Sequence, residues 1–160
     1  MVPMQSADLD AVMEIERLAY RTPWVRQLFI EELGRDFAHI DLVKVRERGA
    51  ARVVAFANYW LVRDEVHILN VATHPDARRQ GHAARLLEQM LAVASRRGCR
   101  LLTLEVRRSN VAALALYARY DFRQVGIRVN YYVDDREDAI VMLRELDVDG
   151  GAKPTKGGES

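Results

Sequence analysis

One segment, residues 66–106, constrains the fold more than any other part of the sequence. The apolar run at 66–73 predicts a strand, and apolar residues after Gly81 recur at the three- and four-residue spacing of an amphipathic helix. Residues 100–106 then alternate apolar and polar side chains, as half-buried strands do. A strand, a helix and a second strand in this order predict a right-handed parallel crossover inside a mixed sheet.

The residues before this segment predict two helices and an antiparallel meander. Helical spacing of apolar residues predicts a first helix that starts near residue 6 or 8. Thr22 followed by Pro23 predicts the N-cap and first position of a second helix, which ends near Gly34. Apolar runs at 40–45 and 53–62 predict two strands that precede the crossover.

The residues after the segment predict one more helix and two more strands. Ser109 is expected to cap a helix that runs to about Arg119, and strands are expected at 123–132 and 139–146. The fold class is therefore α+β, or α/β in looser usage. Residues 147–160 contain four glycines and almost no apolar side chains, so we expect a folded domain over residues 1–146 and a disordered tail at 147–160.

Composition excludes several classes of protein. The 160 residues suit a single domain, and 49% hydrophobic with 29% charged residues is ordinary for a globular chain. No apolar run approaches the roughly 18 residues of a membrane helix. The first ten residues lack the layout of a signal peptide, so we expect a cytoplasmic protein.

Charge and metal-ligand residues exclude further classes. The 24 basic residues nearly balance the 23 acidic ones, which argues against bulk attraction to nucleic acid. A single cysteine, Cys99, excludes a disulfide framework and a multi-cysteine metal site. The four histidines show no metal-binding spacing, so no metal is expected.

The loop that joins the first crossover strand to its helix points to an anion site. It reads RRQGHA over residues 78–83. Gly81 permits a positive φ or close backbone approach, and the helix start offers unpaired N–H groups and the positive end of a dipole. These features suit a phosphate. The alternative from spacing alone is an ordinary strand-to-helix turn with surface arginines.

This loop resembles the R/Q-x-x-G-x-G/A pyrophosphate loop of the GCN5-related N-acetyltransferase (GNAT) superfamily, which binds acetyl-coenzyme A. The resemblance extends to the RimI-type ribosomal-protein alanine N-acetyltransferases over most of residues 10–145. It covers the segments at 67–88, 104–122 and 130–142 and the Thr-Pro-Trp sequence that ends at Trp24. The departures are His82, Ala83 in place of a second glycine, and Asp121 where glycine is usual. Aspartate tolerates a left-handed backbone better than most residues.

The resemblance implies a GNAT-like sheet, mixed but mostly antiparallel, flanked by helices and with the parallel crossover at the cofactor site. It implies acetyl-CoA as cosubstrate and direct transfer in a ternary complex to a protein N-terminus, with the N-terminal alanine of a small-subunit ribosomal protein as the leading substrate. Neither nucleic acid nor a membrane is expected as a partner. The implied cofactor-binding residues are Val71, Ala72, Thr73, Arg78, Arg79, Gln80, Gly81, His82, Ala83, Ala84 and Asn110. The implied substrate-binding residues are Trp24, Tyr131 and Tyr132.

Two residues match the family's proton-transfer groups. Glu105 follows the alternation of its strand and lies opposite the apolar face, where the pattern alone also fits a solvent-facing carboxylate or a partner of Arg107. By resemblance it accepts a proton from the amine, directly or through a water. Tyr117 fits core packing by its helical spacing, and by resemblance it returns a proton to the departing thiolate. Cys99 fits buried packing better than a nucleophile.

The sequence leaves two interpretations open for each of three groups of residues. Asn110 fits a helix cap, or a contact with the coenzyme A arm by resemblance. Residues 71–73 fit a buried strand, or by resemblance a strand edge that pairs with pantetheine. Tyr131 and Tyr132 are expected to face opposite sides of a strand, with the charges at 136–138 in a turn or in contact with a peptide. The alternative functions are lysine or small-amine acetylation and a non-catalytic CoA-binding regulatory module.

Overall fold

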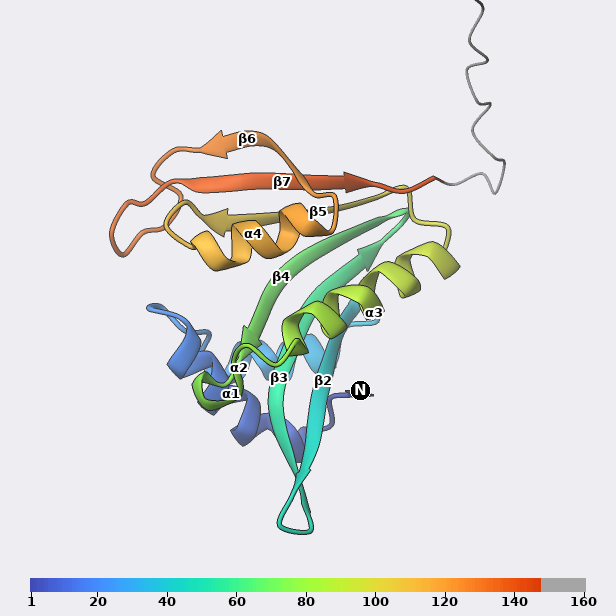
Figure 1. Cartoon of the computed structure of the whole chain (residues 1–160), viewed down its shortest axis with the longest axis vertical. Coiled ribbons are helices and arrows are strands. Elements are labelled where there is room, and N and C mark those ends of the chain that lie inside the picture. The colour runs from blue at the N-terminus through green and yellow to red at the C-terminus, as the bar shows by residue number, and fades with distance from the viewer. Residues whose placement is uncertain (148–160) are drawn as a thin grey trace, which may run out of the picture.

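The computed structural model describes residues 1–147 and contains one mixed sheet of seven strands in the order β1-β2-β3-β4-β5-β7-β6 (Figure 1). The strands are β1 (Val2–Pro3), β2 (Ala38–Glu47), β3 (Ala50–Val62), β4 (Glu65–Thr73), β5 (Leu101–Arg107), β6 (Arg123–Arg128) and β7 (Ala139–Glu145). The α-helices are α1 (Leu9–Ala19), α2 (Arg26–Leu33), α3 (His82–Arg96) and α4 (Val111–Arg119), and single 3₁₀ turns lie at Ser6–Asp8 and Pro75–Ala77. Residues 148–160 of the predicted tail lie outside the described residues.

The predicted crossover is present, and its two strands diverge. β4 and β5 pair in parallel only from Glu65 and Leu101 to Ile68 and Leu104. Beyond Ile68, β4 continues against β3, while β5 continues against β7 (Figure 1). Among the described residues, no strand pairs with the edge of β4 that the divergence leaves open.

Helices cover both faces of the sheet. In the view of Figure 1, α3 and α4 lie in front of it and α1 and α2 lie behind. Leu87 of α3 and Tyr117 of α4 belong to one buried cluster, and Ile15 of α1 and Phe29 of α2 belong to another. Each fully buried side chain of this size contributes roughly 1.5–3 kcal/mol, so both faces anchor the sheet. In residues 1–147, no helix has the length and apolar character needed to cross a bilayer.

The prediction for the start of the second helix is wrong. α2 begins at Arg26 with Val25 as its N-cap. The Thr22 hydroxyl donates instead to Asp134, 3.0 Å away, and the Trp24 N–H donates to the Glu16 carboxylate at 3.1 Å. The groups that were expected to start the helix therefore hold the segment to other parts of the fold.

Two boundaries in the second half also differ from the prediction. The N-cap of α4 is Asn110, whose side-chain oxygen accepts from the Ala113 N–H at 3.2 Å, and not Ser109. The Ser109 N–H donates to Glu137 at 2.7 Å. β6 ends at Arg128, so Tyr131 and Tyr132 lie after the strand and not within it. Asp121 has a φ of 63°, the left-handed conformation expected there.

Candidate acyl-transfer site

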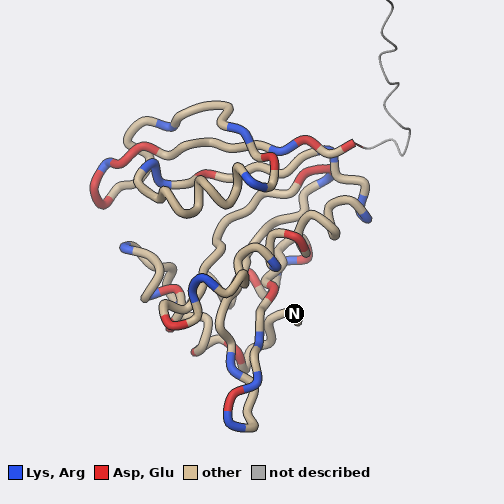
Figure 2. The backbone as a smooth tube through the Cα atoms, in the orientation of Figure 1, with Lys and Arg blue, Asp and Glu red and all other residues tan. Residues whose placement is uncertain are grey.

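The loop before α3 has a backbone suited to an anion. Arg79 and Gly81 have φ values of 62° and 79°, and α3 begins at the next residue, His82. Tight turns with left-handed residues can direct successive backbone N–H groups toward one anion. A Cβ added to Gly81 would contact nothing within 4 Å, so its backbone conformation, and not crowding, favours glycine. Basic residues occupy part of this loop (Figure 2), among them Arg78 and Arg79.

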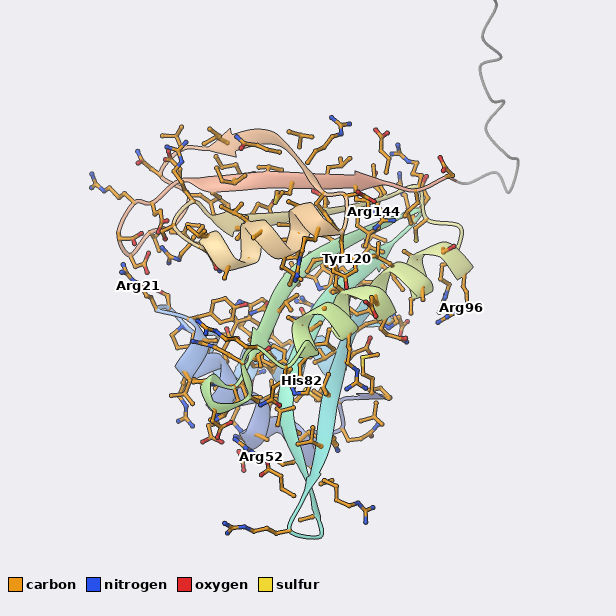
Figure 3. The ribbon with its side chains drawn as sticks, viewed as in Figure 1. Arg21, Arg52, His82, Arg96, Tyr120 and Arg144 are labelled. Atoms are coloured by element: carbon orange, nitrogen blue, oxygen red, sulfur yellow. The ribbon has the colours of Figure 1, made fainter. Side chains whose placement is uncertain are left out.

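His82 contributes to this site through its position rather than through its ring. The side chain is 7% exposed and lies at the start of α3 (Figure 3). Its Nε2 lies 3.3 Å from the Gln80 side-chain oxygen, and its Nδ1 has no hydrogen-bond partner among the described residues. The ring is therefore buried against the protein at the point where α3 begins.

The hydroxyl of Tyr20 is hydrogen-bonded to the open edge of β4. The Tyr20 phenol donates to the Val71 carbonyl at 3.0 Å and accepts from the Val71 N–H at 3.2 Å. Val71 lies three residues past the last parallel pair, where β5 has already turned away. A side chain from the end of α1 thus occupies the backbone groups that a paired strand would use.

Glu105 is a mostly buried carboxylate on β5. Its side chain is 13% exposed, and its Oε2 lies 2.8 Å from Nε2 of His67 on β4. The hydrogen bond to His67 is the main cause that lowers the pKa of Glu105, although partial burial opposes it. Arg128 lies 3.6 Å from the other oxygen and adds to the lowering. Glu105 is therefore an ionised acceptor at neutral pH, and it forms no ion pair with Arg107.

Tyr117 is a protonated phenol on the opposite face of the sheet. Its ring is 7% exposed and packs against Phe122 with centroids 5.6 Å apart. Burial raises the pKa of Tyr117 well above its ordinary value, with a smaller contribution from Tyr132. The side chain consequently keeps its proton over the physiological range.

Several phenols and the carboxylate share one neighbourhood where β4 and β5 part. Burial and then the nearby Glu16, Tyr117 and Tyr132 raise the pKa of Tyr20. The pKa of Tyr132 is raised to about 12, chiefly by burial and in part by Glu105. The parting of the strands thus brings together groups from the two faces of the sheet that an unbroken sheet would separate.

Residues 9–122 match the profile of the acetyltransferase (GNAT) family. The chain belongs to this family. It is 38% identical to the [ribosomal protein bS18]-alanine N-acetyltransferase of Escherichia coli K12 over 141 residues, which are 87% of this chain and 92% of that protein. The family membership and the GNAT fold predicted from the sequence are therefore confirmed.

Solved structures agree with this assignment. The ribosomal-protein-S18-alanine N-acetyltransferase from Escherichia coli matches with a TM-score of 0.79 and 34% identity over 98% of this chain and 97% of that one. Arabidopsis thaliana NAA60 in complex with acetyl-CoA shares the fold, with a TM-score of 0.83 and 19% identity over 91% of this chain and 97% of that chain.

A network of charges ties two loops of this GNAT chain together. Arg107 donates to Asp134, Asp135 and Glu137 of the loop between β6 and β7, at 2.9 to 3.2 Å. From the segment between α1 and α2, Arg21 donates to Asp135 at 2.9 Å and lies below that loop in Figure 3. We call residues 20–24 and 134–137, joined in this way, the clasp.

The predicted aromatic substrate residues line or adjoin the clasp. The Tyr132 ring stacks under the Arg107 guanidinium at 3.9 Å, and Tyr131 packs edge-on against Tyr132 with centroids 5.1 Å apart. Trp24 packs on Phe29 with centroids 5.3 Å apart, which places it partly in the core. Tyr131 and Tyr132 therefore lie in the loop between β6 and β7, outside any strand.

Sequence reasoning missed four residues of this GNAT site. His67 and Tyr20 gave no local signal, because their roles depend on contacts with residues 38 and 51 positions away. Arg107 was noted only as a partner of Glu105. Glu16 could have been found, because a carboxylate follows Ile15 on the apolar stripe of α1. It is 1% exposed and bound by Trp24 and Asn70.

Proposed function

We propose that this GNAT chain transfers the acetyl group of acetyl-CoA directly to the α-amine of a protein N-terminus, with the N-terminal alanine of a small-subunit ribosomal protein as its leading substrate. The observation that carries the proposal is the placement of Glu105, an ionised carboxylate bound to His67, beside the point where β4 and β5 part. The activity named for the Escherichia coli relative supports the choice of substrate.

In the proposed reaction, the amine nitrogen attacks the thioester carbonyl and the C–S bond breaks. Glu105 accepts the proton that the nitrogen gives up, directly or through a water, and Tyr117 protonates the thiolate of coenzyme A. The products are an amide and free coenzyme A thiol. Cys99 is 2% exposed and burial raises the pKa of its thiol, which disfavours an acetyl-cysteine intermediate and supports direct transfer.

The choice of an α-amine follows from the strength of the base. An α-amine has a pKa of about 7.7–8.0 and lysine about 10.4, so at pH 7 roughly a tenth of the former and less than a thousandth of the latter is neutral. Glu105 has a lowered pKa and is a weak base. Glu105 therefore suits an amine that is already partly deprotonated. Acetylation of lysine or of a small amine is the second candidate function.

The cofactor is proposed to bind along the start of α3 and the edge of β4. The left-handed pair Arg79 and Gly81 and the open space above Gly81 fit a diphosphate, and the edge at Val71 fits an extended pantetheine arm. The residues we assign to the cofactor are Val71, Ala72, Thr73, Arg78, Arg79, Gln80, Gly81, His82, Ala83, Ala84 and Asn110. We place the reaction in the cytoplasm, without a metal, a membrane or direct nucleic-acid contact.

Release of free thiol from acetyl-CoA with a panel of short peptides tests the proposal. Peptides that begin with alanine and carry a free α-amine are expected to be acetylated, whereas the same peptides with blocked N-termini are not. Turnover of a blocked peptide that carries a lysine would favour the second candidate. Acetyl-CoA binding without thiol release from any amine would indicate the regulatory module instead.

A further inference from the structure

We propose that Tyr20 is a removable cap on the strand edge that receives the thioester arm, so that binding of acetyl-CoA displaces its phenol from Val71. This inference rests on the proposed function, because it assumes that the cofactor pairs with β4. It adds a residue that neither the sequence nor the family resemblance assigned to the site.

The Tyr20 hydroxyl uses both hydrogen-bonding groups of one β4 residue. It donates to the Val71 carbonyl at 3.0 Å and accepts from the Val71 N–H at 3.2 Å. On a strand, the N–H and C=O of one residue point to the same side, so both groups face the open edge. A single side chain therefore imitates the pairing of a neighbouring strand.

An extended ligand and the phenol cannot both bind these groups. The Val71 N–H has one hydrogen to donate, and the Tyr20 oxygen accepts it. A pantetheine arm laid along β4 as an added strand would need that hydrogen. The competition is confined to the place where β4 has lost β5, because the parallel pairing ends at Ile68 and Leu104.

The main chain around Tyr20 is anchored, which limits the displacement to the side chain. The Tyr20 N–H donates to the Glu16 carbonyl at 3.1 Å, and the Trp24 N–H donates to the Glu16 carboxylate at 3.1 Å. Arg21 and Thr22 between them are bound to Asp135 and Asp134. The phenol can thus leave Val71 by side-chain rotation while the clasp stays closed.

Isothermal titration of acetyl-CoA into wild type, Tyr20→Phe and Tyr120→Phe tests the cap. Loss of one net hydrogen bond that competes with the ligand corresponds to roughly a tenfold change in an equilibrium constant. We expect Tyr20→Phe to bind acetyl-CoA about tenfold more tightly than wild type. Tyr120→Phe, which loses a hydroxyl bound to Glu88 away from β4, is expected to match wild type.

Hydrogen exchange at the Val71 amide provides a second measurement. The amide is expected to exchange faster in free Tyr20→Phe than in free wild type, and equally slowly in both when acetyl-CoA is bound. Unchanged or weaker binding by Tyr20→Phe, with wild type binding normally, would overturn the cap alone. Failure of both proteins to bind acetyl-CoA would overturn the proposed function and the cap with it. Thermal melts of the two variants confirm that both are folded.

Discussion

Glu105 of β5 and His67 of β4 are joined by a 2.8 Å hydrogen bond across the parallel strand pair. Glu105 lies two residues beyond Thr103, the register partner of His67, and one residue beyond the last parallel pair, where the two strands begin to separate. The hydrogen bond keeps the carboxylate of Glu105 in a fixed direction and lowers its pKa. In the proposed reaction, acceptance of the proton from the amine depends on this pair, so it is tested first.

Replacing His67 should change the pH dependence of turnover. The hydrogen bond with His67 is the largest cause that lowers the pKa of Glu105, and burial raises it, so His67→Ala leaves burial opposed chiefly by Arg128 and moves the pKa upward. A general base loses activity as pH falls through its pKa. The acidic limb of kcat in His67→Ala is therefore expected at higher pH than in wild type, with His67→Gln, which keeps an N–H donor, between them. Superimposable kcat profiles over a pH range that includes the acidic limb of the wild type would remove His67 from the mechanism.

Replacing Glu105 should strongly slow acetyl transfer without changing the affinity for acetyl-CoA. Glu105→Gln keeps the shape and a hydrogen-bond acceptor but cannot take a proton. We expect kcat to fall by about 10²-fold or more, with unchanged acetyl-CoA affinity. Glu65→Gln, at the other end of the parallel pair and bound to Arg100, is the matched control and should retain activity. Wild-type kcat in Glu105→Gln at every pH would disprove the assignment.

Tyr117→Phe tests the proton donor. Its hydroxyl has no hydrogen-bond partner among the described side chains, and its ring is held by packing against Phe122. Removal of the oxygen is therefore expected to leave the melting temperature nearly unchanged while it lowers kcat by about 10-fold or more. Single-turnover kinetics separate the chemical step from product release. If the chemical step keeps its wild-type rate in Tyr117→Phe, Tyr117 contributes only to packing of the hydrophobic core.

Glu16 should make the stability of the fold depend on pH. Burial raises the pKa of this carboxyl from 4.5 to about 7. Below the unfolded pKa the group is protonated in both states and carries no penalty, and as pH rises toward 7 the folded state becomes relatively less stable. The cost above pH 7 is roughly 3 kcal/mol.

Urea unfolding of wild type and Glu16→Gln at several pH values measures this cost. The variant is expected to be more stable than wild type at pH 8 and equal to it near pH 4.5. The buried Asn70 side-chain oxygen, which has no partner among the described residues, is available to the new amide. A constant difference between the two proteins over this range would contradict the assignment.

Replacing Arg107 should weaken binding of the acceptor peptide and leave binding of acetyl-CoA unchanged. Arg107→Ala leaves three carboxylates of the clasp without their shared partner and frees the Tyr132 ring. We expect the KM for the peptide to rise by roughly fivefold or more, and the acetyl-CoA affinity to stay constant. Arg100→Ala removes two ion pairs at the opposite end of β5 and is the control. Equal effects of the two substitutions on peptide KM would argue against a role for the clasp.

The parts of the fold that depend on local pattern were predictable. Leu102, Leu104 and Val106 alternate with Glu105, and the structure buries the three apolar side chains on one face of β5. The glycine loop and the amphipathic stripe after it likewise fixed the crossover. These signals lie within one element, where spacing alone determines which side chains share a face.

The parts that depend on contacts between elements were not predictable. The start of α2 is displaced because Thr22 binds Asp134, a residue 112 positions away. β6 stops at Arg128, and Asn130 then adopts a φ of 54°, which turns Tyr131 and Tyr132 out of the expected strand. His67 becomes a partner of Glu105 only through the register between β4 and β5. Each of these depends on tertiary geometry that a single sequence does not display.

On the proposed assignment of the site, the divergence of β4 from β5 gives the two reactants separate approaches. The loop that suits the diphosphate precedes α3 on one side of the sheet, and the clasp lies between the α1–α2 segment and the β6–β7 loop on the other. On that assignment, acetyl-CoA and the acceptor need not pass each other. Substitutions that change the specificity for the acceptor can then accumulate on one side of the sheet without lowering the affinity for acetyl-CoA.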